Sequence, residues 1–159
     1  MRVVFYWESA GLSLTEANPY GGLLGQALAG LGVQVDAGHG RDLDEAWLLE
    51  NRHTVDILHI NCPHLLYDAP DLQGRLALCA DLIGHLSLAR SLGYKIVWTV
   101  HNLYPHDGTY FHLDRLARLA ITSLATTLIV HCRRARCLVR EHFHRDHGVF
   151  VIPHGHFIA

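Results

Sequence analysis

Short apolar segments alternate with amphipathic helical segments along the whole chain, and this alternation is what most restricts the possible folds. Clusters of β-branched and aromatic residues predict strands at residues 2–7, 33–35, 55–61, 94–100, 127–131 and 149–152. Between them, the spacing of apolar residues predicts helices at about 23–31, 42–51, 72–92, 111–124 and 133–143. Because consecutive strands of this pattern are joined by right-handed crossovers, we predict an α/β domain of three layers (α/β/α, Rossmann-like) with a predominantly parallel sheet and helices on both faces.

Size and composition favour one folded domain that spans residues 1–159. Half of the residues are hydrophobic and 18% are charged, a balance that excludes intrinsic disorder. The net charge of −2 argues against a dedicated nucleic-acid binder. We find no secretory signal, no apolar run of about 18 residues and no CxxC pair among the four cysteines. A cytoplasmic protein with reduced thiols is therefore expected.

The 14 histidines are scattered along the chain. They form no HExxH motif, and no Cys/His pairs occur at zinc-finger spacing. From spacing alone, we expect no metal site.

Polar side chains follow several predicted strands directly. The clearest group, His101, Asn102, His106 and Asp107, comes after the apolar run at 94–100. Ligands of open parallel sheets bind beyond the carboxyl ends of the strands, so this group is the first candidate site. The alternative is a turn built by Asn102 and Pro105 in which the histidines have no role.

The other predicted strand ends carry Glu8, Asn61, His64 and His154. Tyr20-Gly21-Gly22 lies between the first strand and the first predicted helix, where glycines let backbone N–H groups approach an anion. The segment matches neither GxGxxG nor the P-loop pattern, and a plain glycine turn is the alternative.

Taken together in order and spacing, these segments resemble the N-terminal domain of a GT-B glycosyltransferase of the retaining, family-four type. The resemblance rests on residues 18–22 (NPYGG), 95–102 (KIVWTVHN), 105–107 (PHD), 127–131 (TLIVH) and 151–155 (VIPHG). It covers almost the whole chain.

The resemblance implies the acceptor-binding half of an enzyme that moves a sugar from a nucleotide-sugar donor to a carbohydrate or lipid-linked acceptor. The nucleotide sugar would be a co-substrate, and neither a further cofactor nor a metal is expected. His101 would be the catalytic residue, placed beside the reacting sugar, and Gly21 and Gly22 would lie near the donor diphosphate. The substrate cleft would be lined by Glu8, Tyr20, Asn61, His64, Asn102, His106, Asp107 and His154.

A C-terminal donor-binding domain is the expected partner, because the chain stops at Ala159, shortly after the linker-like residues 151–155. The 159-residue chain alone is expected to be inactive. One alternative is a non-catalytic Rossmann-like binding module that works with a separate donor-binding chain. Another is a flavodoxin-like or receiver-like domain, although the paired acidic residues of receivers are missing after the first strand.

Six arginines fall on the last two predicted helices and suggest peripheral contact with anionic lipid at the inner face of a membrane. Solvated faces or ion pairs are the other interpretation. They are Arg115, Arg118, Arg133, Arg134, Arg136 and Arg140.

Overall fold

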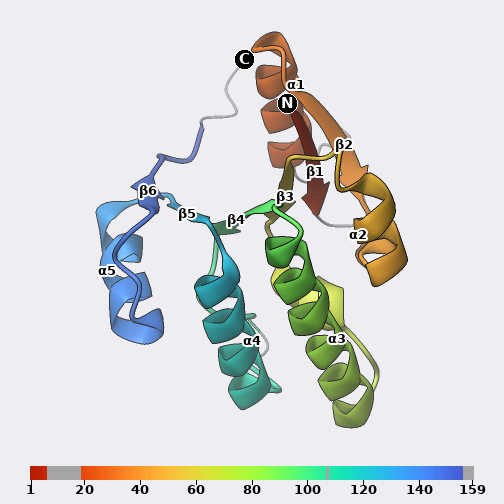
Figure 1. The fold of residues 1–159 in the computed structure, drawn as a ribbon. Coiled ribbons are helices and arrows are strands. Elements are labelled where there is room, and N and C mark those ends of the chain that lie inside the picture. Colours follow the sequence, from red (N-terminus) through yellow and green to blue (C-terminus); the bar gives the residue numbers. More distant parts are fainter. Residues whose placement is uncertain (7–18, 107, 156–159) are drawn as a thin grey trace.

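The computed structural model describes residues 1–6, 19–106 and 108–155. Within this part of the chain, strands and helices alternate as predicted (Figure 1). The strands are β1 (Arg2–Tyr6), β2 (Gln34–Gly38), β3 (Ile57–Ile60), β4 (Lys95–Val100), β5 (Thr127–Val130) and β6 (Val149–Val151). The helices are α1 (Tyr20–Gly30), α2 (Glu45–Asn51), α3 (Leu72–Ser91), α4 (Phe111–Leu124) and α5 (Arg133–Phe143), with 3-10 turns η1 (Gly40–Asp42) and η2 (Pro63–Tyr67).

The six strands form one sheet in the order β2-β1-β3-β4-β5-β6, and every neighbouring pair is parallel. The predicted fold class is confirmed. This is the flavodoxin-like strand order extended by one strand, with the topological switch point between β1 and β3. All carboxyl ends of the strands meet at one edge of the sheet, which is where a ligand is expected.

The two faces of the sheet are covered unequally. Right-handed crossovers place α1 on one face, because it leads from β1 out to β2, and the other four helices on the opposite face. In Figure 1, α1 lies above the strands, while α3, α4 and α5 lie side by side below them. Beyond α1, side chains of the upper face remain accessible: Phe150 is 57% exposed and Ile152 is 50% exposed.

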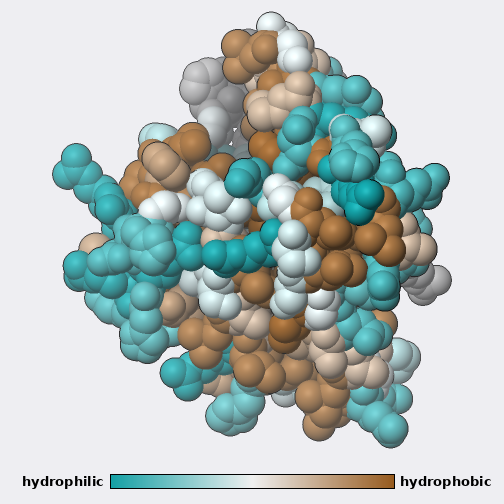
Figure 2. Space-filling view, viewed as in Figure 1, coloured by the Kyte–Doolittle hydropathy of each residue, from teal (hydrophilic) through white to brown (hydrophobic). Residues whose placement is uncertain are grey.

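The hydrophobic core lies between the sheet and the helices of the larger layer. Trp98, Leu58, Leu86 and Ile121 are each at most 1% exposed. Four residues of the predicted apolar stripe of α3 are buried, Cys79, Leu82, Leu86 and Ala89, and Ile83 is half-buried. Leu76, which was predicted to belong to the same stripe, is 47% exposed. A 20-residue helix is about 30 Å long, whereas strands of four to six residues span at most about 20 Å, so the first turns of α3 extend past the sheet. Figure 2, viewed as in Figure 1, shows apolar side chains at the bottom of the molecule, where the lower ends of α3 and α4 lie.

Several predicted boundaries differ from the structure. The first helix begins at Tyr20 instead of residue 23, because Pro19 adopts a helical φ of −77° and its carbonyl accepts the Leu23 N–H. Gly21 and Gly22 therefore belong to the first turn of α1 and are buried, so the prediction that they form a loop before the helix is wrong.

The second strand, predicted at residues 33–35, runs from Gln34 to Gly38. The 3-10 turns account for two further differences. The helix predicted from residue 42 starts at Glu45, after η1, because the Asp44 carboxylate caps it by accepting the Trp47 N–H. The connection predicted as a loop from residue 62 to residue 73 contains η2, which begins at Pro63. None of the described helices combines the length and the hydrophobicity needed to cross a bilayer.

Candidate functional site

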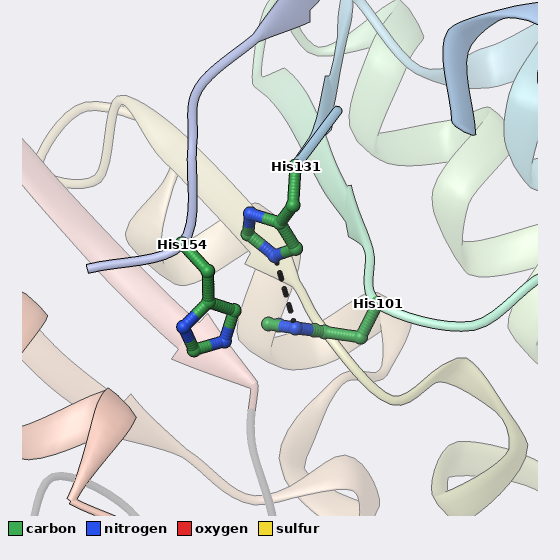
Figure 3. Close-up of side chains that lie close together, drawn as sticks. All are labelled: His101, His131 and His154. Atoms are coloured by element: carbon green, nitrogen blue, oxygen red, sulfur yellow. Dashed lines mark hydrogen bonds between the residues drawn. The ribbon is translucent and has the colours of Figure 1, made fainter. Parts of the chain in front are cut away.

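Three histidines meet at the carboxyl edge of the sheet (Figure 3). The register pairs Val100 with Val130, so the residues that follow, His101 after β4 and His131 after β5, lie beside each other. His154 approaches both rings from the chain segment beyond β6. One ring nitrogen from each histidine lies within 4.8 Å of the other two. Parallel pairing thus gathers three imidazoles that are far apart in the sequence.

Hydrogen bonds link these rings to fixed oxygen atoms. His131 Nδ1 lies 3.0 Å from the carbonyl oxygen of Ile152, and His131 Nε2 lies 3.1 Å from His101 Nδ1. On its other side, His101 Nε2 lies 3.2 Å from Oδ1 of Asn61, the residue that follows β3. Asn61 Nδ2 donates to the Tyr6 carbonyl oxygen at the end of β1. One polar chain therefore crosses the edge from β1 to β6.

Tyr20, the first residue of α1, packs against the same cluster. Its ring meets the His101 ring nearly perpendicularly, with centroids 4.8 Å apart, and lies 5.2 Å from the His154 ring. Its hydroxyl is hydrogen-bonded to the Thr99 side chain, whose Oγ1 lies 2.8 Å from Nε2 of the buried His59. The start of α1 is thereby fixed against the ends of β3 and β4.

Burial determines the charge state of this edge. Burial, together with the neighbouring imidazoles of His131, His154 and His59, lowers the pKa of His101 to about 4. Burial alone lowers the pKa of His59 to about 4. Burial also raises the pKa of the Tyr20 hydroxyl, against the hydrogen bond from Thr99. At neutral pH these three groups are uncharged.

Two cavities border the cluster. The larger has a volume of about 370 Å³ and is mostly apolar; it is lined by Tyr20, Leu23, Leu24, His59, Ile129, His131, Ile152, Pro153 and Gly155. The smaller, of about 50 Å³, is lined by Asn61, Cys62, Pro63, His64, His101, Asn102, Tyr104, Pro105, His106 and Arg118. The contact between His101 Nδ1 and His131 Nε2 joins a wall of one cavity to a wall of the other.

The structure brings most of the predicted site residues together. Five of them line the smaller cavity: Asn61, His64, His101, Asn102 and His106. Tyr20 and His154 contact the His101 ring from the side of α1. Gly21 and Gly22 line neither cavity, and Glu8 and Asp107 lie outside the described residues.

Three site residues were not predicted: His131, His59 and Arg118. His131 follows a predicted strand directly, so the rule that selected His101 applies to it equally. His59 lies within a strand, and only the parallel neighbour β4 brings Thr99 to it. Arg118 carries no local signal at all.

Arg118 also corrects the expectation of six surface arginines on the last helices. It is 2% exposed, and its Nη1 donates to the Tyr67 hydroxyl at 2.8 Å and contacts Asp114 Oδ1 at 3.3 Å. The Tyr67 hydroxyl in turn donates to Asp114 Oδ1 at 2.6 Å. A buried cation needs such partners, and these come from η2 as well as from α4 itself. The other five arginines are exposed.

A further cavity, of about 660 Å³, lies at the opposite edge of the sheet, beside Lys95 and Thr126 at the amino ends of β4 and β5. Arg145 lines this cavity, and its guanidinium donates hydrogen bonds to the carbonyl oxygens of Thr122, Ala125 and Thr126. Arg145 therefore stabilises the end of α4. The histidine cluster at the carboxyl edge remains the candidate site.

Neither the models of known protein families nor the sequences of characterised proteins match this chain.

Proposed function

We propose that this domain is the acceptor-binding half of a retaining glycosyltransferase that uses a nucleotide-sugar donor. The observation that carries the proposal is the gathering of His101, Tyr20, Asn61 and His64 at the carboxyl edge of a parallel sheet, beside an apolar cavity. A donor-binding domain, on the same polypeptide or on a separate chain, would close over this edge. Polar strand ends next to an apolar wall suit an amphipathic substrate.

His101 would position a sugar hydroxyl or ring oxygen and stabilise developing charge through hydrogen bonds. Its pKa of about 4 keeps it neutral near pH 7, so it presents hydrogen-bonding nitrogens without adding a charge. Arg118 also lines the small cavity, with its guanidinium held by the Tyr67 hydroxyl and paired with the Asp114 carboxylate, so the pair adds little net charge there.

The apolar cavity favours a lipid-linked acceptor over a purely carbohydrate one. Leu23, Leu24, Ile129 and Ile152 line it, and hydroxyl-rich sugars gain little from such walls. Exposed arginines on α5 would attract anionic headgroups and hold the domain at a membrane surface. The second candidate is a non-catalytic binding module, which the same cavity supports because it is already formed within this one domain.

The test is sugar transfer by residues 1–159 with and without a donor-binding domain, assayed against a panel of nucleotide sugars and lipid-linked acceptors. The isolated domain should show negligible transfer, because proximity of two bound substrates contributes about 7–11 kcal/mol to such reactions. In the two-domain enzyme, His101→Ala should lower kcat about 10²- to 10³-fold. His112→Ala, which removes an exposed histidine of α4, is the control and should have no effect.

Turnover by residues 1–159 alone at a rate comparable to that of the two-domain enzyme would contradict the proposal. So would unchanged turnover in His101→Ala. Binding of the acceptor by the isolated domain, with no transfer in any two-domain combination, would favour the non-catalytic module.

A further inference from the structure

We propose that His101, His131 and His154 together bind one divalent transition-metal ion, best fitted by Zn²⁺, and leave a coordination position open. The metal would replace the direct hydrogen bond to a sugar proposed for His101, because Nδ1 would bind the metal while Nε2 is held by Asn61. The inference rests on the geometry of the three rings. It replaces the expectation of no metal site, which was drawn from sequence spacing: the three ligands come from different strand ends.

The outer hydrogen bonds orient two of the rings as metal ligands. The carbonyl oxygen of Ile152 can only accept, so His131 carries its proton on Nδ1. Oδ1 of Asn61 likewise accepts, because Nδ2 of the same amide donates to the Tyr6 carbonyl, so His101 carries its proton on Nε2. In metal sites, ligating histidines almost always donate their second N–H to a carbonyl or a carboxylate in this way.

The inner nitrogens then both present lone pairs to the same space. His101 Nδ1 and His131 Nε2 lie 3.1 Å apart, with neither ring supplying a proton between them in these tautomers. A metal cation between the two nitrogens would accept both lone pairs. Two imidazoles on tetrahedral zinc, with Zn–N bonds of about 2.0–2.1 Å, place their nitrogens about 3.3 Å apart. The observed separation is close to that value.

His154 completes the set from a more accessible position. All three ligand nitrogens lie within 4.8 Å of one another, whereas two nitrogens on one tetrahedral zinc ion are about 3.3 Å apart. Tetrahedral coordination would require the His154 ring, which is exposed on the segment after β6, to move by up to about 1.5 Å toward the other two rings. Figure 3 shows the three rings converging from three separate segments.

The donor set indicates the chemistry of the site. Among the described residues, only imidazoles join the cluster, without a thiolate or a carboxylate. Three protein ligands with an open position are typical of catalytic zinc, whereas structural zinc is held by four. The open position would take water or an anionic substrate oxygen and polarise it.

The test is cobalt binding to untagged protein from which metals have been stripped by a chelator. Co²⁺ should bind with one equivalent per chain, give the visible absorption bands of a tetrahedral or five-coordinate site, and be displaced by Zn²⁺. The triple variant His101→Ala/His131→Ala/His154→Ala should lose these bands. The matched control, His53→Ala/His112→Ala/His147→Ala, removes three exposed histidines and should keep them.

His154→Ala alone decides the matter if the triple variant fails to fold, since His154 is exposed; cobalt affinity should fall at least about 10-fold. Azide added to the cobalt protein should shift the bands, and an unchanged spectrum would refute the open position. Equal cobalt binding in His154→Ala and wild type, the absence of stoichiometric binding, or thiolate-to-cobalt charge-transfer bands would overturn the proposal.

Discussion

The buried imidazole of His59 predicts a specific loss of stability in acid. It is 6% exposed, hydrogen-bonded to Thr99 Oγ1, and burial lowers its pKa from 6.5 to about 4. Because the unfolded chain binds a proton below pH 6.5 and the folded chain does not until about pH 4, acid favours unfolding. This stabilising difference is fully present above pH 6.5 and is lost as the pH falls toward 4.

The size of the effect follows from the width of that window. A pH of 5 is about 1.5 units below the ordinary histidine pKa of 6.5, so the imidazole is mostly protonated in the unfolded chain. In the folded chain it is still mostly neutral at this pH. At about 1.4 kcal/mol per unit, the free energy of unfolding should be roughly 2 kcal/mol lower at pH 5 than at pH 7 because of this residue. The pKa of His101 is lowered too, so it adds a loss in the same direction.

Substitution by glutamine isolates this contribution. His59→Gln keeps a group that can hydrogen-bond Thr99 but removes the titration. Urea unfolding at pH 7 and at pH 5 should show a loss on acidification that is roughly 2 kcal/mol smaller in His59→Gln than in wild type. His112→Gln, at an exposed position, should behave like wild type. An equal acid-induced loss in His59→Gln and wild type would refute the assignment of a neutral, buried His59.

Two further substitutions test the packing that positions the site. Arg118→Met leaves the buried Asp114 carboxylate without its cation and should lower the free energy of unfolding by about 3–5 kcal/mol, measured in urea; a change below about 1 kcal/mol would contradict the buried pair. Asp71→Ala removes the side chain that accepts the Gly74 N–H at the start of α3 and should lower the free energy of unfolding by about 1 kcal/mol. Asp81→Ala, at an exposed position of the same helix, should lower it little, and equal losses in the two variants would contradict the cap.

The fold was predictable because its main determinant is periodic and local. Alternating apolar runs and helical stripes require only the nearest neighbours in sequence, and they specified the element order and the parallel sheet. Helix starts were less predictable, since they depend on single residues: Pro19 places α1 three residues earlier than the apolar pattern does, and Gly21 and Gly22 become helical as a result.

Only one rule predicted residues of the candidate site: ligands bind beyond the carboxyl ends of parallel strands. Polar residues directly after buried strands identified His101, Asn61 and His154, and these do meet. Arg118 was assigned to the surface because nothing near it in sequence reveals Tyr67 as a partner, which is 51 positions away. The contact between His101 and His131 was not predicted, because it depends on the lateral register between β4 and β5.

Anomalous diffraction at the zinc absorption edge gives the most direct test of the carboxyl edge as the functional site. Crystals would be grown from untagged protein with one equivalent of Zn²⁺ per chain. We predict one strong anomalous peak within bonding distance of the facing nitrogens of His101, His131 and His154. Ordered side chains at these three residues with no peak between them, or the strongest peak at histidines elsewhere, would contradict it.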